Sequence, residues 1–203
     1  MTDPAVTTDE AVDGRRAWRE RNRNAVVDAL LDLYEVGNVR PSAEDIAVRS
    51  GVSRRSLFRY FDDMDELCRV AIDRHRDRVS HLLPVDELGE GSLDERLDRL
   101  VAQRLRLFRS IAPVARVARM RAAIQPILKA QLRADGKLLR RQLERHLEPE
   151  LSALGAEPRA LTLAAADLLT SFESFDFLTE RSGLSAAEAG KAIRGALAAL
   201  LAG

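Results

Sequence analysis

Apolar residues recur along the chain at the spacing of amphipathic helices, and no segment alternates with the period of two that a strand requires. The first segment carries Trp18, Val26, Ala29, Leu30 and Leu33 and ends at Gly37, which predicts a helix over about residues 16–35. Capping residues, glycines and prolines divide the rest. We expect a short helix after Ser42 and further helices over about residues 53–61, 63–84, 92–111, 113–123, 126–147, 158–181 and 185–202. The sequence therefore predicts an all-α protein.

A linker, PVDELGEGS at residues 84–92, interrupts the helical pattern. We expect an N-terminal three-helix domain at residues 1–62, with residues 1–14 disordered, and a helical C-terminal domain at residues 63–203. The first residues, MTDPAVTTDEAVDG, are acidic and polar, unlike a signal peptide. No window approaches 18 uninterrupted apolar residues, so we expect no membrane span and a cytoplasmic protein.

Composition excludes several kinds of site. Cys68 is the only cysteine, which rules out an internal disulfide and a cysteine-cluster metal site. The three histidines, at positions 75, 81 and 146, show no i,i+4 pair with a carboxylate in reach. No glycine-rich phosphate loop, nucleophile elbow or cluster of acid and base groups appears. We therefore predict no metal, no cofactor and no enzyme.

The net charge is zero, but positive charge is concentrated in two places. Arginines stand at positions 15, 16, 19, 21 and 23 against Glu20 alone, and at 54, 55 and 59 with no acid between Ser53 and Phe61. A basic patch need not show in the total when acidic segments elsewhere balance it. The first run has two interpretations that the sequence leaves open, namely a solvated helix face and attraction to phosphates.

Residues 41–67, PSAEDIAVRSGVSRRSLFRYFDDMDEL, have the features of a helix-turn-helix. Ala47 is small enough for the point where two helices cross, and Gly51 suits a turn that needs positive φ. Ile46, Val52 and Leu57 are the apolar residues expected to hold the two helices together. The outward positions of the second helix are then Arg54, Arg55, Ser56, Phe58 and Arg59. Such a face suits contact with bases and phosphates in the major groove.

This segment resembles the tetracycline-repressor (TetR) family of bacterial regulators over about residues 16–72. The matching residues are Gly37, Pro41-Ser42, Ile46-Ala47, Ser50-Gly51-Val52-Ser53, Leu57-Phe58, Tyr60-Phe61 and Glu66-Leu67. The chain departs from the family pattern at Arg55, Phe58 and Met64, where glycine, tyrosine and lysine are usual. The resemblance implies that the helix at 53–61 reads double-stranded DNA. The implied contact residues are Ser42, Ser53, Arg54, Arg55, Ser56, Phe58, Arg59 and Tyr60.

The resemblance also implies that the C-terminal helices enclose a small-molecule effector pocket. His75 and Arg104 interrupt apolar stripes, and buried polar groups need partners, so they are the candidate effector-binding residues. The alternative is that each pairs with a neighbouring protein group or reaches solvent.

The last two predicted helices, 158–181 and 185–202, are apolar on more than one side. We expect a homodimer in which they form a four-helix bundle with a two-fold partner. The predicted interface residues are Leu161, Ala165, Leu168, Phe172, Phe175, Ile193, Leu197 and Leu200. The two N-terminal DNA-binding domains of the dimer would then read a palindromic operator. We expect a repressor released by an effector; the alternative is an effector-independent DNA-binding protein whose C-terminal domain only dimerises or recruits partners.

Overall fold

The computed structural model describes residues 7–202, with side chains from residue 13 onward. Within residues 7–202 every regular element is helical, so the predicted all-α class is confirmed. The chain divides into two compact units, a head unit (Met1–Asp77) and a body unit (Arg78–Gly203). Sequence analysis expects the boundary at 62/63. Residues 63–77 belong with the head unit because they are tied to the first helix: Arg74 donates hydrogen bonds to the Asn24 carbonyl and to Asp28, at 3.3 and 3.1 Å.

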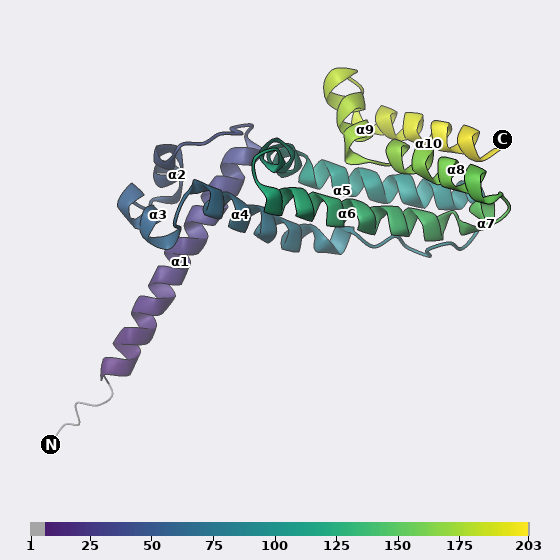
Figure 1. The fold of residues 1–203 in the computed structure, drawn as a ribbon. Coiled ribbons are helices and arrows are strands. Elements are labelled where there is room, and N and C mark those ends of the chain that lie inside the picture. The colour runs from purple at the N-terminus through teal and green to yellow at the C-terminus, as the bar shows by residue number, and fades with distance from the viewer. Residues whose placement is uncertain (1–6, 203) are drawn as a thin grey trace. The chain divides into compact units, whose positions relative to one another are not determined.

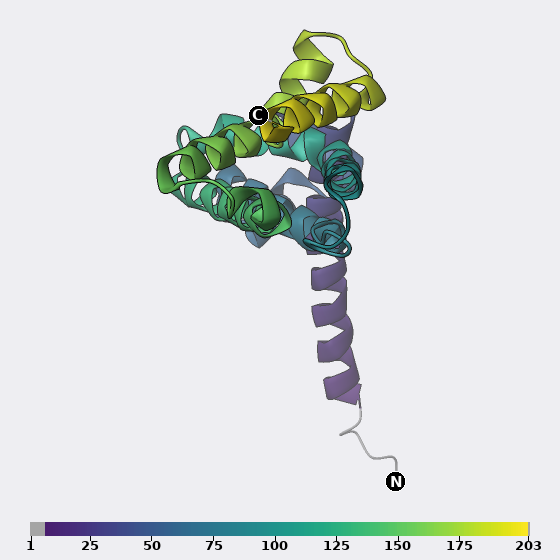
Figure 2. The same ribbon diagram turned by 90° about the vertical axis from the view of Figure 1, so that its right-hand side faces the viewer.

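The head unit contains α1 (Thr7–Glu35), α2 (Ala43–Ser50), α3 (Arg54–Tyr60) and most of α4 (Met64–Val79) (Figure 1). Helix α1 already includes residues 7–14, for which we expected disorder; residues 1–6 lie outside the described part. Extending a helix costs far less than starting one, so the anchored half of α1 can carry the additional turns. Figure 2 shows these first turns continuing beyond α2 and α3 without another helix of the head unit beside them.

The core of the head unit forms where the second half of α1 meets the other three helices. Its fully buried apolar side chains include Val26, Val27, Leu30, Leu31, Ile46, Leu57, Phe61, Leu67 and Ala71. Cys68 is also buried and accepts a hydrogen bond from the Tyr34 hydroxyl at 3.3 Å. Its thiol is therefore part of this packing.

The body unit continues with η1 (Ser80–Leu82), α5 (Leu93–Ala122), α6 (Pro126–His146), α7 (Glu148–Leu151), α8 (Ala156–Leu169), α9 (Phe172–Asp176), η2 (Phe177–Arg181) and α10 (Ala186–Ala202). Helix α5 packs against both α6 and α10, and α10 packs against α8. Two apolar clusters fill the interior. One joins α5, α6, α8 and α10 around Leu100, Leu143 and Leu197. The other surrounds Phe108, Phe172 and Phe175, whose ring centroids lie 5.7–6.3 Å apart.

The predicted break at Pro113 is wrong, because α5 runs without interruption from Leu93 to Ala122. A proline inside a helix removes one backbone hydrogen bond and disturbs the preceding turn. Here the neighbouring residues Ala112, Val114 and Ala115 are all buried, so tertiary packing holds the helix on both sides of the proline.

The single helix predicted over 158–181 is also wrong, because three shorter elements, α8, α9 and η2, cover it. The interruption lies at Thr170 and Ser171. The Thr170 hydroxyl donates to the Ala166 carbonyl at 2.8 Å, and the Ser171 hydroxyl donates to the Leu168 carbonyl at 2.8 Å. Ser171 also caps α9 by accepting from the Ser174 amide at 3.1 Å. Hydroxyls that bond to nearby backbone in this way compete with helix continuation.

The linker between η1 and α5 is fastened by a buried histidine. His146 Nδ1 accepts from the Gly89 amide at 3.1 Å, and His146 Nε2 lies 2.7 Å from the Arg96 carbonyl. A carbonyl only accepts, so Nε2 carries the proton and Nδ1 does not. Burial lowers the pKa of His146 below its ordinary value of 6.5, although the hydrogen bond to Arg96 acts in the opposite direction.

The free energy of unfolding should therefore decrease as pH falls from about 7 to 5. In the unfolded chain the imidazole of His146 takes up a second proton near pH 6.5, whereas in the native state its lowered pKa delays this protonation. His146→Gln should flatten the decrease. Denaturant unfolding followed by circular dichroism at several pH values measures both proteins. The same pH dependence in parent and variant would show that another group is responsible.

Candidate nucleic-acid interface

The turn between α2 and α3 is set by local backbone chemistry. Ser42 and Asp45 form a complete capping box at the start of α2: the Ser42 hydroxyl accepts from the Asp45 amide at 3.1 Å, and the Ser42 amide donates to the Asp45 carboxylate at 2.8 Å. The Ser42 amide and the Ser42 hydroxyl both donate to the Asp45 carboxylate, at 2.8 and 2.9 Å, and these two hydrogen bonds lower the pKa of Asp45. At the other end of α2, Gly51 takes the left-handed conformation with φ 68°, as the turn requires. Ser53 then caps α3 by accepting from the Ser56 amide at 3.3 Å.

Three apolar side chains fix how α3 is presented. Ile46 and Leu57 are fully buried and Val52 is nearly so, as predicted for the residues that join the two helices. Because Leu57 turns inward, its neighbours on α3 must turn outward. Arg54, Arg55, Phe58 and Arg59 are exposed, and Ser56 is partly exposed. The structure thus brings together the outward residues that the sequence predicts for contact with DNA.

Two of these arginines have partners within the protein. Arg54 lies 3.8 Å from Glu44 of α2, and both side chains are more than half exposed, so this pair contributes little to stability. Arg59 donates to the Tyr60 hydroxyl at 3.3 Å. Both guanidinium groups can therefore exchange these weak contacts for phosphates or base edges.

Tyr60 and Ser42, the predicted backbone contacts, are placed less favourably. The Tyr60 side chain is only 8% exposed. Burial acts to raise the pKa of Tyr60, but hydrogen bonds from Arg59 and Asn22 and the charges of Arg59 and Arg19 outweigh it, so the pKa is lowered. The Ser42 hydroxyl donates to Asp45 at 2.9 Å and is thus occupied by the capping box. Each would have to give up an internal contact to bind a phosphate.

The sequence leaves open whether the arginine run of α1 belongs to this site, and the structure places part of that run beside α3. Arg23 stacks on the Phe61 ring with its guanidinium carbon 4.8 Å from the ring centroid. Together with Arg19 and Asn22, which act on Tyr60, it places one face of α1 directly beside the end of α3. The arginine run was visible in the sequence, but which side of α1 meets α3 depends on tertiary packing.

The two candidate effector-binding residues lie in different units, and each is buried. His75 belongs to α4. Arg104, in α5, is 2% exposed, and its guanidinium donates to Gln103 at 2.5 Å, to Gln142 at 3.3 Å and to the Leu139 carbonyl at 3.0 Å. Burial lowers the pKa of Arg104 to about 10, so it stays charged at neutral pH. These contacts favour the alternative in which Arg104 pairs with protein groups.

The eight predicted interface residues separate into two sets. Phe172, Phe175, Ile193 and Leu197 are buried within the body unit, so their own chain already covers them. Leu161 and Leu168 of α8 are each 65% exposed, while Ala165 and Leu200 are partly exposed. The buried four pack against α5 and neighbouring helices of their own chain, so the proposed interface is supported by the exposed members of the set alone.

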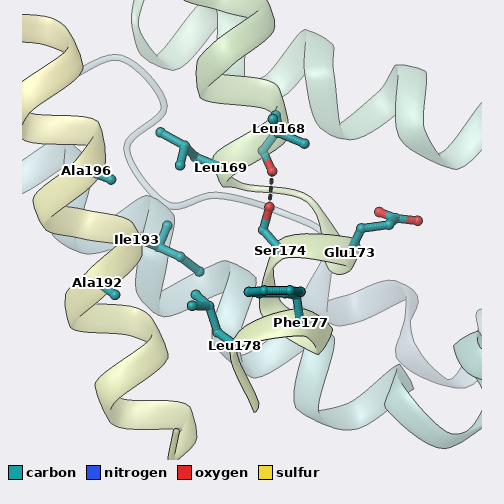
Figure 3. A pocket seen from close by; sticks show the side chains of 9 residues that line it. All are labelled: Leu168, Leu169, Glu173, Ser174, Phe177, Leu178, Ala192, Ile193 and Ala196. Carbon is teal, nitrogen blue, oxygen red and sulfur yellow. Dashed lines mark hydrogen bonds between the residues drawn. The ribbon is translucent and has the colours of Figure 1, made fainter. Parts of the chain in front are cut away.

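An open apolar groove of about 460 Å³ lies beside this exposed set (Figure 3). It is lined by Leu168, Leu169, Glu173, Ser174, Phe177, Leu178, Ala192, Ile193 and Ala196. In Figure 3 the carboxylate of Glu173 points away from α10, so the wall facing that helix is hydrocarbon. The Ser174 hydroxyl donates to the Leu168 carbonyl and shapes the bend between α8 and α9.

Among the described residues, the requirements of a metal site and of a membrane-spanning helix are not met. Among residues 13–202 no group of three or more His, Cys, Asp or Glu side chains could hold a metal ion. None of the helices within residues 7–202 combines the length and the apolar character needed to cross a membrane.

The helix-turn-helix region of the chain is similar to that of bacterial transcriptional regulators. Residues 33–71 match the family model for bacterial regulatory proteins of the tetR family. The chain is 33% identical over 97 residues to the HTH-type transcriptional repressor Rv3405c of Mycobacterium tuberculosis and to the HTH-type transcriptional regulator Mb3439c of Mycobacterium bovis. The aligned part covers 46% of this chain and 51% of each relative, so the chain spans about half the length of the curated relatives it matches. No solved structure matches the chain.

Replacing Arg54 or Arg59 by alanine should weaken binding to a selected DNA duplex by about 1–3 kcal/mol each if the side chain contacts a base. If it contacts a phosphate, the slope of log affinity against log salt should instead become shallower by about one unit. Fluorescence anisotropy over a range of salt concentrations distinguishes the two cases. Arg106→Ala, an exposed arginine of α5, is the matched control. Parent-like binding by both α3 variants at every salt concentration would mean that this face does not contact DNA.

Proposed function

We propose that this chain is a DNA-binding regulator of the TetR family, whose model its residues 33–71 match, and that it represses transcription as a homodimer. The observation that carries the proposal is the exposed arginine face of α3, held outward by the burial of Leu57. Repression is supported by the relative from Mycobacterium tuberculosis, which is an HTH-type transcriptional repressor.

DNA reading itself favours a dimer. One recognition helix touches too few base pairs for useful specificity, whereas two heads separated by one turn of DNA, about 34 Å, would read a palindrome. Genome-wide selection of bound fragments, followed by footprinting, tests this part. Enrichment of a palindrome upstream of genes whose expression rises on deletion of the regulator is the expected result.

The exposed side of α8 and α10 supports the proposed dimer interface. Leu161, Ala164 and Leu168 recur at spacings of three and four along α8 and are exposed together. On α10 the exposed positions include Ala192, Gly195 and Ala199, which are small enough for close helix packing. Since α8 packs against α10, these residues form one apolar surface that continues into the groove. A two-fold partner offering the same surface would cover it.

Leu161→Glu combined with Leu168→Glu should convert the protein to a monomer that is still helical. Each leucine contributes about 1.5–3 kcal/mol when fully buried, and a two-fold interface buries every one of them twice. Both side chains are largely exposed within one chain, so the fold should survive.

Light scattering after size exclusion should give twice 22.5 kDa for the parent and 22.5 kDa for the variant, with operator affinity reduced more than by any single arginine change. Ile127→Glu, at an exposed position of α6, is the control and should stay dimeric. A parent that is monomeric at micromolar concentration contradicts the interface.

Release from DNA by a small-molecule effector is the finer part of the proposal, and it rests on the buried residues His75 and Arg104. A ligand that uses Arg104 would compete with Gln103 and Gln142. These two glutamines also donate to the Leu83 carbonyl, at 3.1 and 2.9 Å, just after α4 and η1 in the chain. Ligand binding there would therefore alter the contacts that hold Leu83 within the body unit.

Titration of the protein–operator complex with a panel of small organic compounds tests this part. At least one compound should release the DNA, and Gln142→Leu should change the concentration needed for release. If operator affinity is the same with every compound, the effector-independent alternative is supported instead.

A further inference from the structure

The first turns of α1 carry a stripe of side chains that the helix-turn-helix itself does not use. Positions 15, 18, 19, 22 and 23 recur at spacings of three and four, so Arg15, Trp18, Arg19, Asn22 and Arg23 share one face of the helix. Residues 13–20 are all exposed, and Trp18 is 51% exposed. The stripe is therefore basic, aromatic and open to solvent over its first half.

The C-terminal end of the stripe is fixed against the end of the recognition helix. Arg23 stacks on Phe61, and Asn22 and Arg19 both act to lower the pKa of the Tyr60 hydroxyl. The opposite side of α1 faces α4, because Asn24 and Asp28 bind Arg74 there. Consequently the exposed half of the stripe lies on the side of α1 that faces α3. It extends along α1 beyond the end of α3.

We propose that this face of α1, through Trp18 and Arg19 and extended by Arg15, is a second DNA-binding element that contacts the sugar–phosphate backbone beyond the reach of α3. The arginine guanidinium matches the geometry of phosphate, and the indole N–H of tryptophan is a hydrogen-bond donor that a phosphate oxygen can accept from. The proposal rests on DNA binding by the helix-turn-helix and adds a contact that lies outside the recognition helix.

Helix geometry sets how far this element reaches. The eight residues from Arg23 back to Arg15 rise about 12 Å. Along the axis of the duplex each strand presents a phosphate about every 3.4 Å, so a helix lying parallel to this axis passes one phosphate per ~3.4 Å. The stripe can therefore cover roughly three to four additional phosphates. The helix also begins at Thr7, which leaves two turns before Arg15, so the stripe does not oppose the dipole at the helix N-terminus.

Trp18 provides a direct readout, because it is the only tryptophan of the chain. The probe is a duplex selected from a random library by the parent protein, prepared with long arbitrary flanks and also cut back to the sequence that α3 requires. With the flanked duplex, quenching of Trp18 fluorescence by acrylamide should decrease at saturation. With the short duplex it should stay close to that of the free protein. If acrylamide quenching is unchanged on the saturated flanked duplex, the proposal is overturned while binding by α3 stands.

Arg19→Gln supplies the second measurement, with Arg21→Gln as its matched control. Arg21 is exposed on the same helix but lies away from the stripe, so both variants lose one charge and only the first loses the proposed contact. On the flanked duplex, Arg19→Gln should make the slope of log affinity against log salt shallower by about 0.9, and Arg21→Gln should change it far less.

A purely structural role of Arg19, exerted through Tyr60, would weaken the short and the flanked duplex equally, and that result would overturn the proposal. Equal effects of Arg19→Gln and Arg21→Gln on the flanked duplex would also overturn the proposal, since they would indicate only long-range electrostatic attraction without a specific contact. A protein that binds no duplex in either form would instead contradict the proposed function.

Discussion

A seven-residue helix is far too short to be stable by itself in water. The presentation of α3 therefore depends on the burial of Leu57 against Ile46 and Val52, with no accessible surface left on Leu57 or Ile46. The Ser53 cap and the left-handed Gly51 then fix where α3 begins and in which direction it runs. Every outward side chain of the recognition surface takes its position from this one packed contact. The same contact brings Phe61 to α1, where Arg23 stacks on it.

The features that the sequence predicted well are those encoded over a few neighbouring residues. Serine followed three positions later by an acidic residue marks a helix start, and the capping boxes at Ser42 and Ser92 are complete. The left-handed glycines are equally local, and Gly37 has φ 86°. The failures at Pro113 and at Thr170 have the opposite origin. Whether the helix continues at these two positions depends on packing against helices that are distant in the sequence. No pattern of neighbouring residues predicts that packing.

Apolar periodicity shows that a helix buries two sides but does not say which side faces its own core. This is why Phe172 and Phe175, assigned to a partner surface, instead pack against Phe108 in the body unit. Leu161 and Leu168 are apolar like these two phenylalanines, but both leucines are exposed on the surface of the chain. For DNA contact the ambiguity was smaller, since charged and hydroxyl-bearing residues on a short helix have only one side on which they can remain solvated. The outward face of α3 was thus predictable residue by residue, whereas its support by α1 was not.

The zero net charge conceals two different uses of arginine. In the body unit many arginines are neutralised across helices, with ion pairs from Arg116 to Asp176, Arg119 to Glu173, Arg140 to Asp167, Arg159 to Glu148 and Arg194 to Asp98. These pairs link neighbouring helices of the body unit. Beside the recognition helix, Arg23 and Arg59 instead stack on aromatic rings, and Arg55 is exposed. Stacking on a ring leaves the guanidinium charge in place, so these residues form a local basic surface, although residues 1–77 as a whole carry 13 basic and 16 acidic side chains. A neutral chain can therefore attract DNA to one defined surface without binding it along the whole molecule.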